Sequence, residues 1–148
     1  MIPKGRVIGL DLGSARIGVA VTDSEQRLAT PVDVIARSGH KAADHRTVAG
    51  LVVDYEAVGV VVGIPLSMSG ATGTAARAAL QEVEELRAAL PVEVDTVDER
   101  LTTVSAAAAL RAAGRKARAQ RAVIDQTAAA VLLQSWVDRR WSEQGAHS

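Results

Sequence analysis

The chain opens with two short apolar runs that are separated by a four-residue turn. Residues 6–12 and 17–22 have the length and composition of strands, and the Gly-Ser-Ala-Arg segment at 13–16 favours a reversal between them. A third run, 29–36, contains Pro31, which removes a ladder donor and favours a position at the edge of a sheet. We therefore expect three consecutive antiparallel strands. This beginning excludes folds whose sheet is entirely parallel.

Helical and strand patterns alternate along the rest of the chain. Apolar residues recur at helical spacing in some segments, whereas continuous or alternating β-branched runs predict strands in others. The expected elements after the third strand cover approximately 44–56, 58–64, 75–90, 92–97, 103–113 and 123–141. The order βββαβαβαα predicts an α/β protein with a five-stranded mixed sheet and helices on both faces.

Length and composition favour one domain in a reducing compartment. The chain has 148 residues, and a second independent core would leave both cores marginal, so we expect a single domain over 1–141 and a flexible tail over 142–148. The absence of cysteine excludes a disulfide framework and a thiolate zinc site. No apolar stretch reaches the roughly 18 residues of a membrane span. We expect a cytoplasmic protein without a membrane partner.

Four carboxylates, in three parts of the chain, stand where an ordinary surface pattern does not predict them. Asp11 interrupts a buried strand, which is costly unless the carboxylate binds turn amides, a partner or a cation. Asp98 and Glu99 follow the fifth strand, where α/β folds place ligands, although an acidic turn in solvent is the alternative. Asp125 lies near the start of an apolar helix, where the helix dipole also favours an acid.

Together these acids predict a cation site. Strand alternation puts Asp98 and Glu99 on opposite faces, so only one of them can share a pocket with Asp11. Carboxylate oxygens suit Mg²⁺ or Mn²⁺, and paired metals are a common device for phosphodiester displacement. We interpret Asp11, Glu99 and Asp125 as candidate catalytic residues and as ligands of a two-metal site.

Basic residues predict a local contact with phosphates. The chain has 17 basic and 17 acidic residues, so a polyanion would have to be held by a local patch. Between Arg100 and Ile124 there is no acid, and a solvated helix turn is the simpler account of the basic residues there, which are Arg100, Arg111, Arg115, Lys116, Arg118 and Arg121. Arg16, in the first turn, is a further candidate. The loop 67–74 before a helix also suits an anion, although a capping loop explains it equally well.

The aromatic residues and the histidines give little indication of a functional site. The aromatic residues are only Tyr55, Trp136 and Trp141, too few for a base-stacking platform, and Trp136 is expected to pack in the core. Recognition would then rest on backbone and shape, with weak sequence preference. The three histidines have no partner at a defined spacing that would indicate a ligand or a base.

Four segments resemble the YqgF, or RuvX, family of RNase H-like nucleases. They are GLDLGSARIGVAV at 9–21, VVGIPLSMSGATG at 61–73, DERLTT at 98–103 and AVIDQTAAAVLLQSWVD at 122–138. The resemblance spans almost the whole chain. It implies an RNase H-like fold and a divalent-metal nuclease whose acids match Asp11, Glu99 and Asp125.

The resemblance also implies two candidate substrates. The first is pre-16S rRNA, in maturation of its 5′ end during ribosome biogenesis, and the alternative is a Holliday junction in DNA recombination or repair. The classical resolvase pattern carries an acid on the fourth strand, where this chain has Gly63-Ile64-Pro65. A monomer suffices for RNA trimming, whereas symmetric junction cleavage requires a homodimer.

Two other classes of protein fit the sequence less well than a nuclease does. A non-catalytic RNA-binding assembly factor would not need the set of carboxylates. An actin-like ATPase would need a second domain and a second phosphate loop, which 148 residues do not hold.

Overall fold

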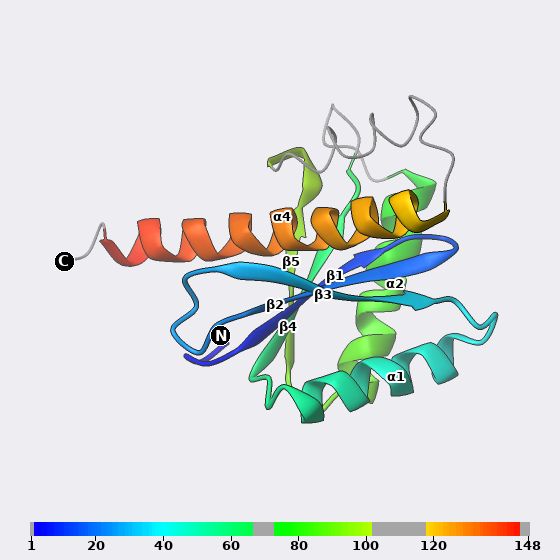
Figure 1. Ribbon diagram of the computed structural model, residues 1–148, viewed down its shortest axis with the longest axis horizontal. Helices are drawn as coiled ribbons and strands as arrows, with labels where there is room; N and C mark the ends of the chain where they lie inside the picture. The colour runs from blue at the N-terminus through cyan, green and yellow to red at the C-terminus, as the bar shows by residue number, and fades with distance from the viewer. Residues whose placement is uncertain (1, 67–72, 102–117, 146–148) are drawn as a thin grey trace.

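The computed structural model describes residues 2–66, 73–101 and 118–145, without the side chains of 101, 118–127 and 144–145. Strands and helices follow one another in the expected order (Figure 1). Their bounds are β1 (Val7–Leu12), β2 (Arg16–Thr22), β3 (Ala29–Ala36), α1 (Lys41–Asp54), β4 (Gly59–Ile64), α2 (Thr74–Ala89), β5 (Glu93–Asp98), the 3₁₀ helix η1 (Glu99–Leu101) and α4 (Arg118–Gly145). The helix expected over 103–113 lies outside the described residues.

The strands form one mixed sheet in the order β3-β2-β1-β4-β5. β1 pairs antiparallel with β2, which pairs antiparallel with β3, whereas β1, β4 and β5 are parallel. The predicted five-stranded mixed sheet is thus confirmed, and β3 with its Pro31 lies at the edge. Because β1, β4 and β5 are parallel and adjacent, their carboxyl ends meet at one edge of the sheet.

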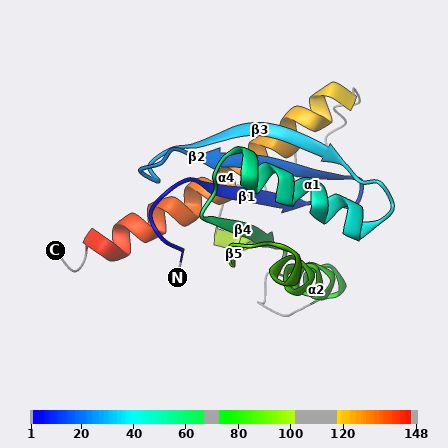
Figure 2. The ribbon, with the colours of Figure 1, turned by 90° about the horizontal axis from the view of Figure 1, so that it is seen from below.

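Helices cover both faces of this sheet. α1 and α2 pack on one face, where Val48 and Leu86 join a core with Ile8 and Leu10. α4 packs on the other face, where Leu132 joins a second core that includes strand residues of β1, β4 and β5. In Figure 2, α1 crosses in front of the strands and α4 passes behind them. The two faces of each strand therefore belong to two different cores.

Small residues let α4 approach β1 closely. A Cβ atom added at Gly9 would lie 2.7 Å from the Cβ of Leu133, so glycine is required at this crossing. Ala128 and Ala129 on the helix are fully buried against the sheet. This close approach holds the amino-terminal part of α4 near the edge at which β1 ends.

The last helix is longer than the sequence pattern predicted. It was expected over 123–141, but α4 begins at Arg118 and continues through Gly145. Residues 142–145, which were assigned to a tail, are therefore helical, and 146–148 lie outside the described residues. Within the described part of the chain, no helix combines the length and apolar character that crossing a membrane requires.

Candidate functional site

A pocket of about 310 Å³ lies at the edge where the parallel strands end. Its lining includes Asp11 from β1, Arg16 from the start of β2 and Glu99 from η1, together with the turn 13–15 and Pro65. All three charged residues are half-buried. Predicted residues from two distant segments of the sequence, 9–21 and 98–103, thus line one pocket.

The two adjacent acids at the end of β5, Asp98 and Glu99, lie on different faces of the sheet. Val97 belongs to the core under α4, whereas Val94 belongs to the core under α1 and α2. Because side chains alternate along a strand, Asp98 continues the side of Val94. Glu99, in η1, lies against Gly63 next to Leu132, on the side of Val97. Asp11 follows Val7 at even spacing on the α4 side of β1. The expected alternation therefore assigns Glu99, and not Asp98, to the face of Asp11.

Gly63 provides the space in which the Glu99 side chain lies. A Cβ atom at Gly63 would stand 2.8 Å from Oε1 of Glu99 and 3.0 Å from Cδ2 of Leu132. On β1, Leu10 pairs with Val62, so Gly63 lies beside Asp11 in the parallel register, with strands about 4.8 Å apart. The acid that follows the fifth strand thus reaches back over the fourth strand. The sequence pattern did not predict this role for Gly63, although a glycine within a β-branched run indicates that another group approaches the strand closely.

The variant Gly63→Ala tests this arrangement. We expect cleavage of nucleic acid to fall by about tenfold or more, because the added methyl group must displace the Glu99 carboxylate from its position. The methyl group also meets Cδ2 of the buried Leu132, so we expect a modest fall of the melting temperature, and cleavage is compared at a temperature at which the variant is fully folded. The control Gly50→Ala adds the same methyl group in α1, where nothing lies within 4 Å of the new Cβ. Unchanged cleavage by Gly63→Ala would contradict the role of this glycine.

Asp98 forms an ion pair with Arg100 instead of lining the pocket. Arg100 donates Nη2 to Oδ2 of Asp98 at 2.6 Å and its backbone N–H to Oδ1 at 2.9 Å. The hydrogen bonds from the guanidinium lower the pKa of Asp98 below its ordinary value. Arg100, a predicted phosphate contact, therefore has an internal carboxylate partner.

The remaining predicted residues lie partly outside the described structure. Asp125 is in α4, four residues before Ala129 and seven before Leu132, a register that puts its backbone on the side of the helix that faces the sheet. Arg118 and Arg121 are also in α4, whereas Arg111, Arg115, Lys116 and the loop 67–72 lie outside the described residues. Among the side chains that the structure describes, no three candidate metal ligands form a group.

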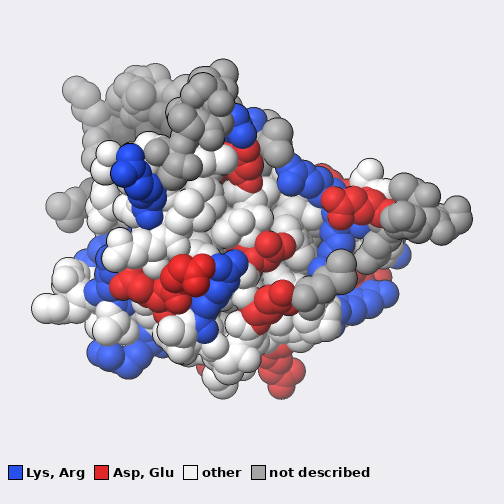
Figure 3. All heavy atoms as spheres, turned by 180° about the vertical axis from the view of Figure 1, so that it is seen from behind, with Lys and Arg blue, Asp and Glu red and all other residues white. Residues whose placement is uncertain are grey.

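Charges elsewhere on the described surface are mixed. Figure 3 shows the back of the molecule, where acidic and basic side chains lie beside one another. Among the described residues of this face, no patch of one sign covers the surface.

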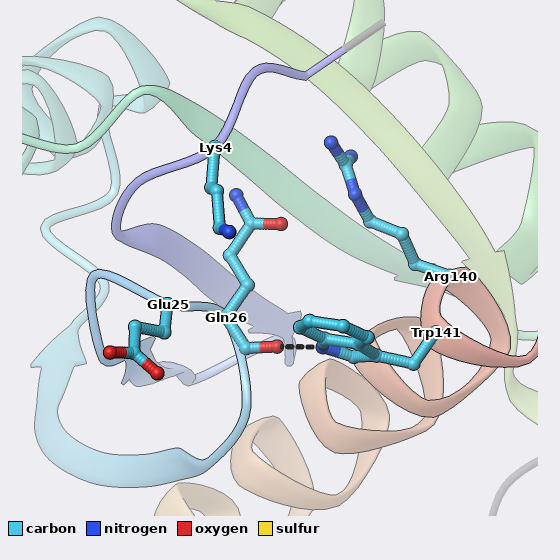
Figure 4. Close-up of a pocket in the computed structure, with 5 residues that line it drawn as sticks. All are labelled: Lys4, Glu25, Gln26, Arg140 and Trp141. Atoms are coloured by element: carbon cyan, nitrogen blue, oxygen red, sulfur yellow. Dashed lines mark hydrogen bonds between the residues drawn. The ribbon is translucent and has the colours of Figure 1, made fainter. Parts of the chain in front are cut away.

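A second pocket, of about 270 Å³, lies at the opposite edge of the sheet (Figure 4). Lys4, Glu25, Gln26, Arg140 and Trp141 line it, and the indole N–H of Trp141 donates to the backbone oxygen of Gln26 at 2.6 Å. Lys4 precedes β1, whereas Asp11 is near its end, so the two pockets are separated by roughly the length of a strand. This pocket holds only one carboxylate and none of the predicted site residues.

Comparisons with known proteins agree with the geometry. The family model RuvX, described as Holliday junction resolvase, matches residues 5–139. A protein of Mycobacterium leprae named "Putative pre-16S rRNA nuclease" is 51% identical over 138 residues, which cover 92% of this chain and 74% of that protein. A protein of Rhodococcus opacus with the same name is 50% identical over 141 residues, which cover 93% of this chain and 79% of that protein.

A solved structure shares the fold at low sequence identity. The structure of Thermus thermophilus RuvC in complex with a Holliday junction substrate superposes with a TM-score of 0.57 at 18% identity. The match covers 93% of this chain and 96% of that one. The similarity to RuvC confirms the expected RNase H-like α/β fold.

Proposed function

Because this chain belongs to the RuvX family, we propose that it is a divalent-metal-dependent endonuclease that processes the 5′ end of pre-16S rRNA. The observation that carries the proposal is the pocket that Asp11 and Glu99 line together with Arg16. Two carboxylates beside a guanidinium supply both a site for a cation and a contact for a phosphate. The names of the relatives from Mycobacterium and Rhodococcus support pre-16S rRNA as the substrate.

The donor set of the pocket fits a hard divalent cation. Asp11 offers carboxylate oxygens from β1 and Glu99 from η1, which follows β5 on the far side of β4, and Asp125 is the third ligand of the proposal. Such donors suit Mg²⁺ or Mn²⁺, which retain several waters. When bound, a pair of these ions would activate water and stabilise the leaving oxygen of a phosphodiester. The protein's own part is to hold the acids at one edge of a rigid sheet.

Basic side chains would hold the backbone of the nucleic acid. Arg16 lines the pocket and is the contact nearest to the acids. The other proposed contacts are Arg100, Arg115, Lys116, Arg118 and Arg121. Contacts of this kind position a substrate without reading its bases, which suits a chain with three aromatic residues.

The alternative substrate is a Holliday junction, which the description of the matching family model favours. A junction resolvase requires two active sites related by a two-fold axis, whereas trimming of an rRNA end requires one. We propose that the chain acts on structured RNA in the cytoplasm, where ribosomes are assembled, as a monomer or a homodimer.

A cleavage assay with two substrates tests the proposal. Purified protein is incubated with a pre-16S rRNA precursor and, separately, with a four-way DNA junction, in Mg²⁺ or in Mn²⁺. We expect cleavage of the precursor near the 5′ end of the mature RNA, loss of cleavage in EDTA, and recovery when the metal is restored, because the proposed reaction relies on bound metal to activate water.

The outcomes separate the candidate functions. Cleavage of the junction with an intact precursor would establish the resolvase alternative. Precursor binding without cleavage in either metal would indicate an assembly factor, and cleavage that persists in EDTA would contradict metal dependence.

A further inference from the structure

A buried ion-pair network lies on the face of the sheet that α1 and α2 cover. Glu82 of α2 and His45 of α1 are 5% and 4% exposed, and Nε2 of His45 donates to Oε2 of Glu82 at 2.8 Å. Arg37, directly after β3, donates Nη1 to Oε2 of Glu82 at 2.7 Å and Nη2 to Oε1 at 3.0 Å. One carboxylate thus joins α1, α2 and the end of β3.

Arg37 also binds the turn between β1 and β2. Its Nε donates to the backbone oxygen of Gly13 at 3.0 Å, and its backbone N–H donates to the oxygen of Ala15 at 2.9 Å. Gly13 and Ala15 line the same pocket as Asp11 and Arg16. A single side chain therefore connects the buried carboxylate to the turn that carries the candidate site.

The buried charges of this network fix a geometry that apolar side chains of the same size would not fix. Burial raises the pKa of Glu82, but the hydrogen bonds from Arg37 and His45 outweigh burial, and the pKa is lowered overall. Buried ion pairs add little stability compared with apolar residues of the same size, whereas their hydrogen bonds allow only one geometry. Such a network is therefore suited to holding a turn in place.

We propose that Arg37, Glu82 and His45 form a positioning network that holds the turn 13–16 and thereby the placement of Asp11 and Arg16 in the pocket. None of the three contacts the substrate in this proposal. Its consequence for cleavage rests on the proposed nuclease function, whereas its effect on the turn does not.

Two variants and a matched control test the network. Arg37→Lys keeps the positive charge but loses the planar fork, so it cannot serve both Glu82 and Gly13. Glu82→Gln keeps the shape of the side chain and removes its charge. The control is Glu85→Gln, which breaks the 3.0 Å ion pair between Glu85 and Lys41. That pair joins the same two helices at the surface and does not touch the turn.

Hydrogen exchange of the turn amides is the decisive readout. In both variants we expect exchange of the Gly13 and Arg16 amides to rise by about tenfold, the factor for losing one hydrogen bond to a charged group. Amides in the centre of β1 and β4 should exchange as before, and Glu85→Gln should match the wild type. The affinity for Mn²⁺ and the cleavage rate should fall by about 10- to 100-fold, as for other groups that orient metal ligands.

Each result decides between a positioning role and a structural one. Unchanged exchange in the turn would overturn the proposal, and so would a rise of equal size throughout the sheet, because that pattern reports a general loss of stability. A wild-type protein that cleaves no nucleic acid would overturn the nuclease function alone. Exchange and Mn²⁺ affinity do not depend on turnover, so they would still test the network.

Discussion

Asp11→Asn is expected to reduce metal-dependent cleavage of the rRNA precursor by about 100- to 1,000-fold. Asparagine keeps the shape of the side chain and one of its oxygens but removes the negative charge that a divalent cation requires. Asp11 pairs with Gly18 of β2, and the preceding residue of its strand, Leu10, pairs with Val62 of β4, so the local backbone is well anchored. Single-turnover cleavage at saturating protein, with the thermal midpoint measured in parallel, separates loss of chemistry from loss of fold.

Asp33→Asn is the matched control for this variant. Asp33 is an exposed acid on β3, where its Oδ1 accepts the backbone N–H of Val34. We expect its rate to stay within about twofold of the wild type, as for most surface substitutions. If Asp11→Asn cleaved as fast as this control, the carboxylate would not be a metal ligand.

Glu99→Gln is expected to lower cleavage about 100-fold, whereas Asp98→Asn should change it by no more than about twofold. The two acids are neighbours in sequence and carry the same charge. Glu99 lines the pocket and lies against Gly63, whereas Asp98 is paired with Arg100. Rates measured over a range of Mn²⁺ concentrations should reach half of their maximum at a lower Mn²⁺ concentration in Asp98→Asn than in Glu99→Gln.

This pair of variants tests whether the acid must lie on the face of the sheet that carries the pocket. An effect of equal size at both positions would show that cleavage requires negative charge near the strand end, whichever face of the sheet the acid lies on. A larger effect at Asp98 would contradict the assignment of Glu99 to the pocket.

The acids of the pocket could be selected from the sequence because local patterns identify them. A carboxylate in a strand such as Val7–Leu12 conflicts with burial, and alternation along Glu93–Asp98 separates Asp98 from Glu99. The third member, Asp125, was selected as an acid near the start of an apolar helix, and the resemblance implies the same residue. The face on which Asp11 and Glu99 meet depends on where α4 packs, and the strand pattern by itself does not contain that information.

Contacts across the sheet could not be predicted. Arg37 is 24 residues from Gly13 and 45 residues from Glu82, and neither spacing matches a helical or strand period. The sequence indicated only a basic residue after an edge strand. Likewise, Gly63 was recognised as a departure from the resolvase pattern, but its role follows from the position of Glu99 above it.

The sequence by itself determined the order of the strands and helices, the mixed sheet and the family. Those properties follow from hydrophobic periods of two to four residues and from motifs that are continuous in the chain. Only the tertiary structure decided that Glu99 reaches over Gly63 while Asp98 binds Arg100, and that Arg37 ties the turn 13–16 to a buried carboxylate. The physical reason is that these contacts join residues whose separation is set by strand order and helix packing, which no local period encodes.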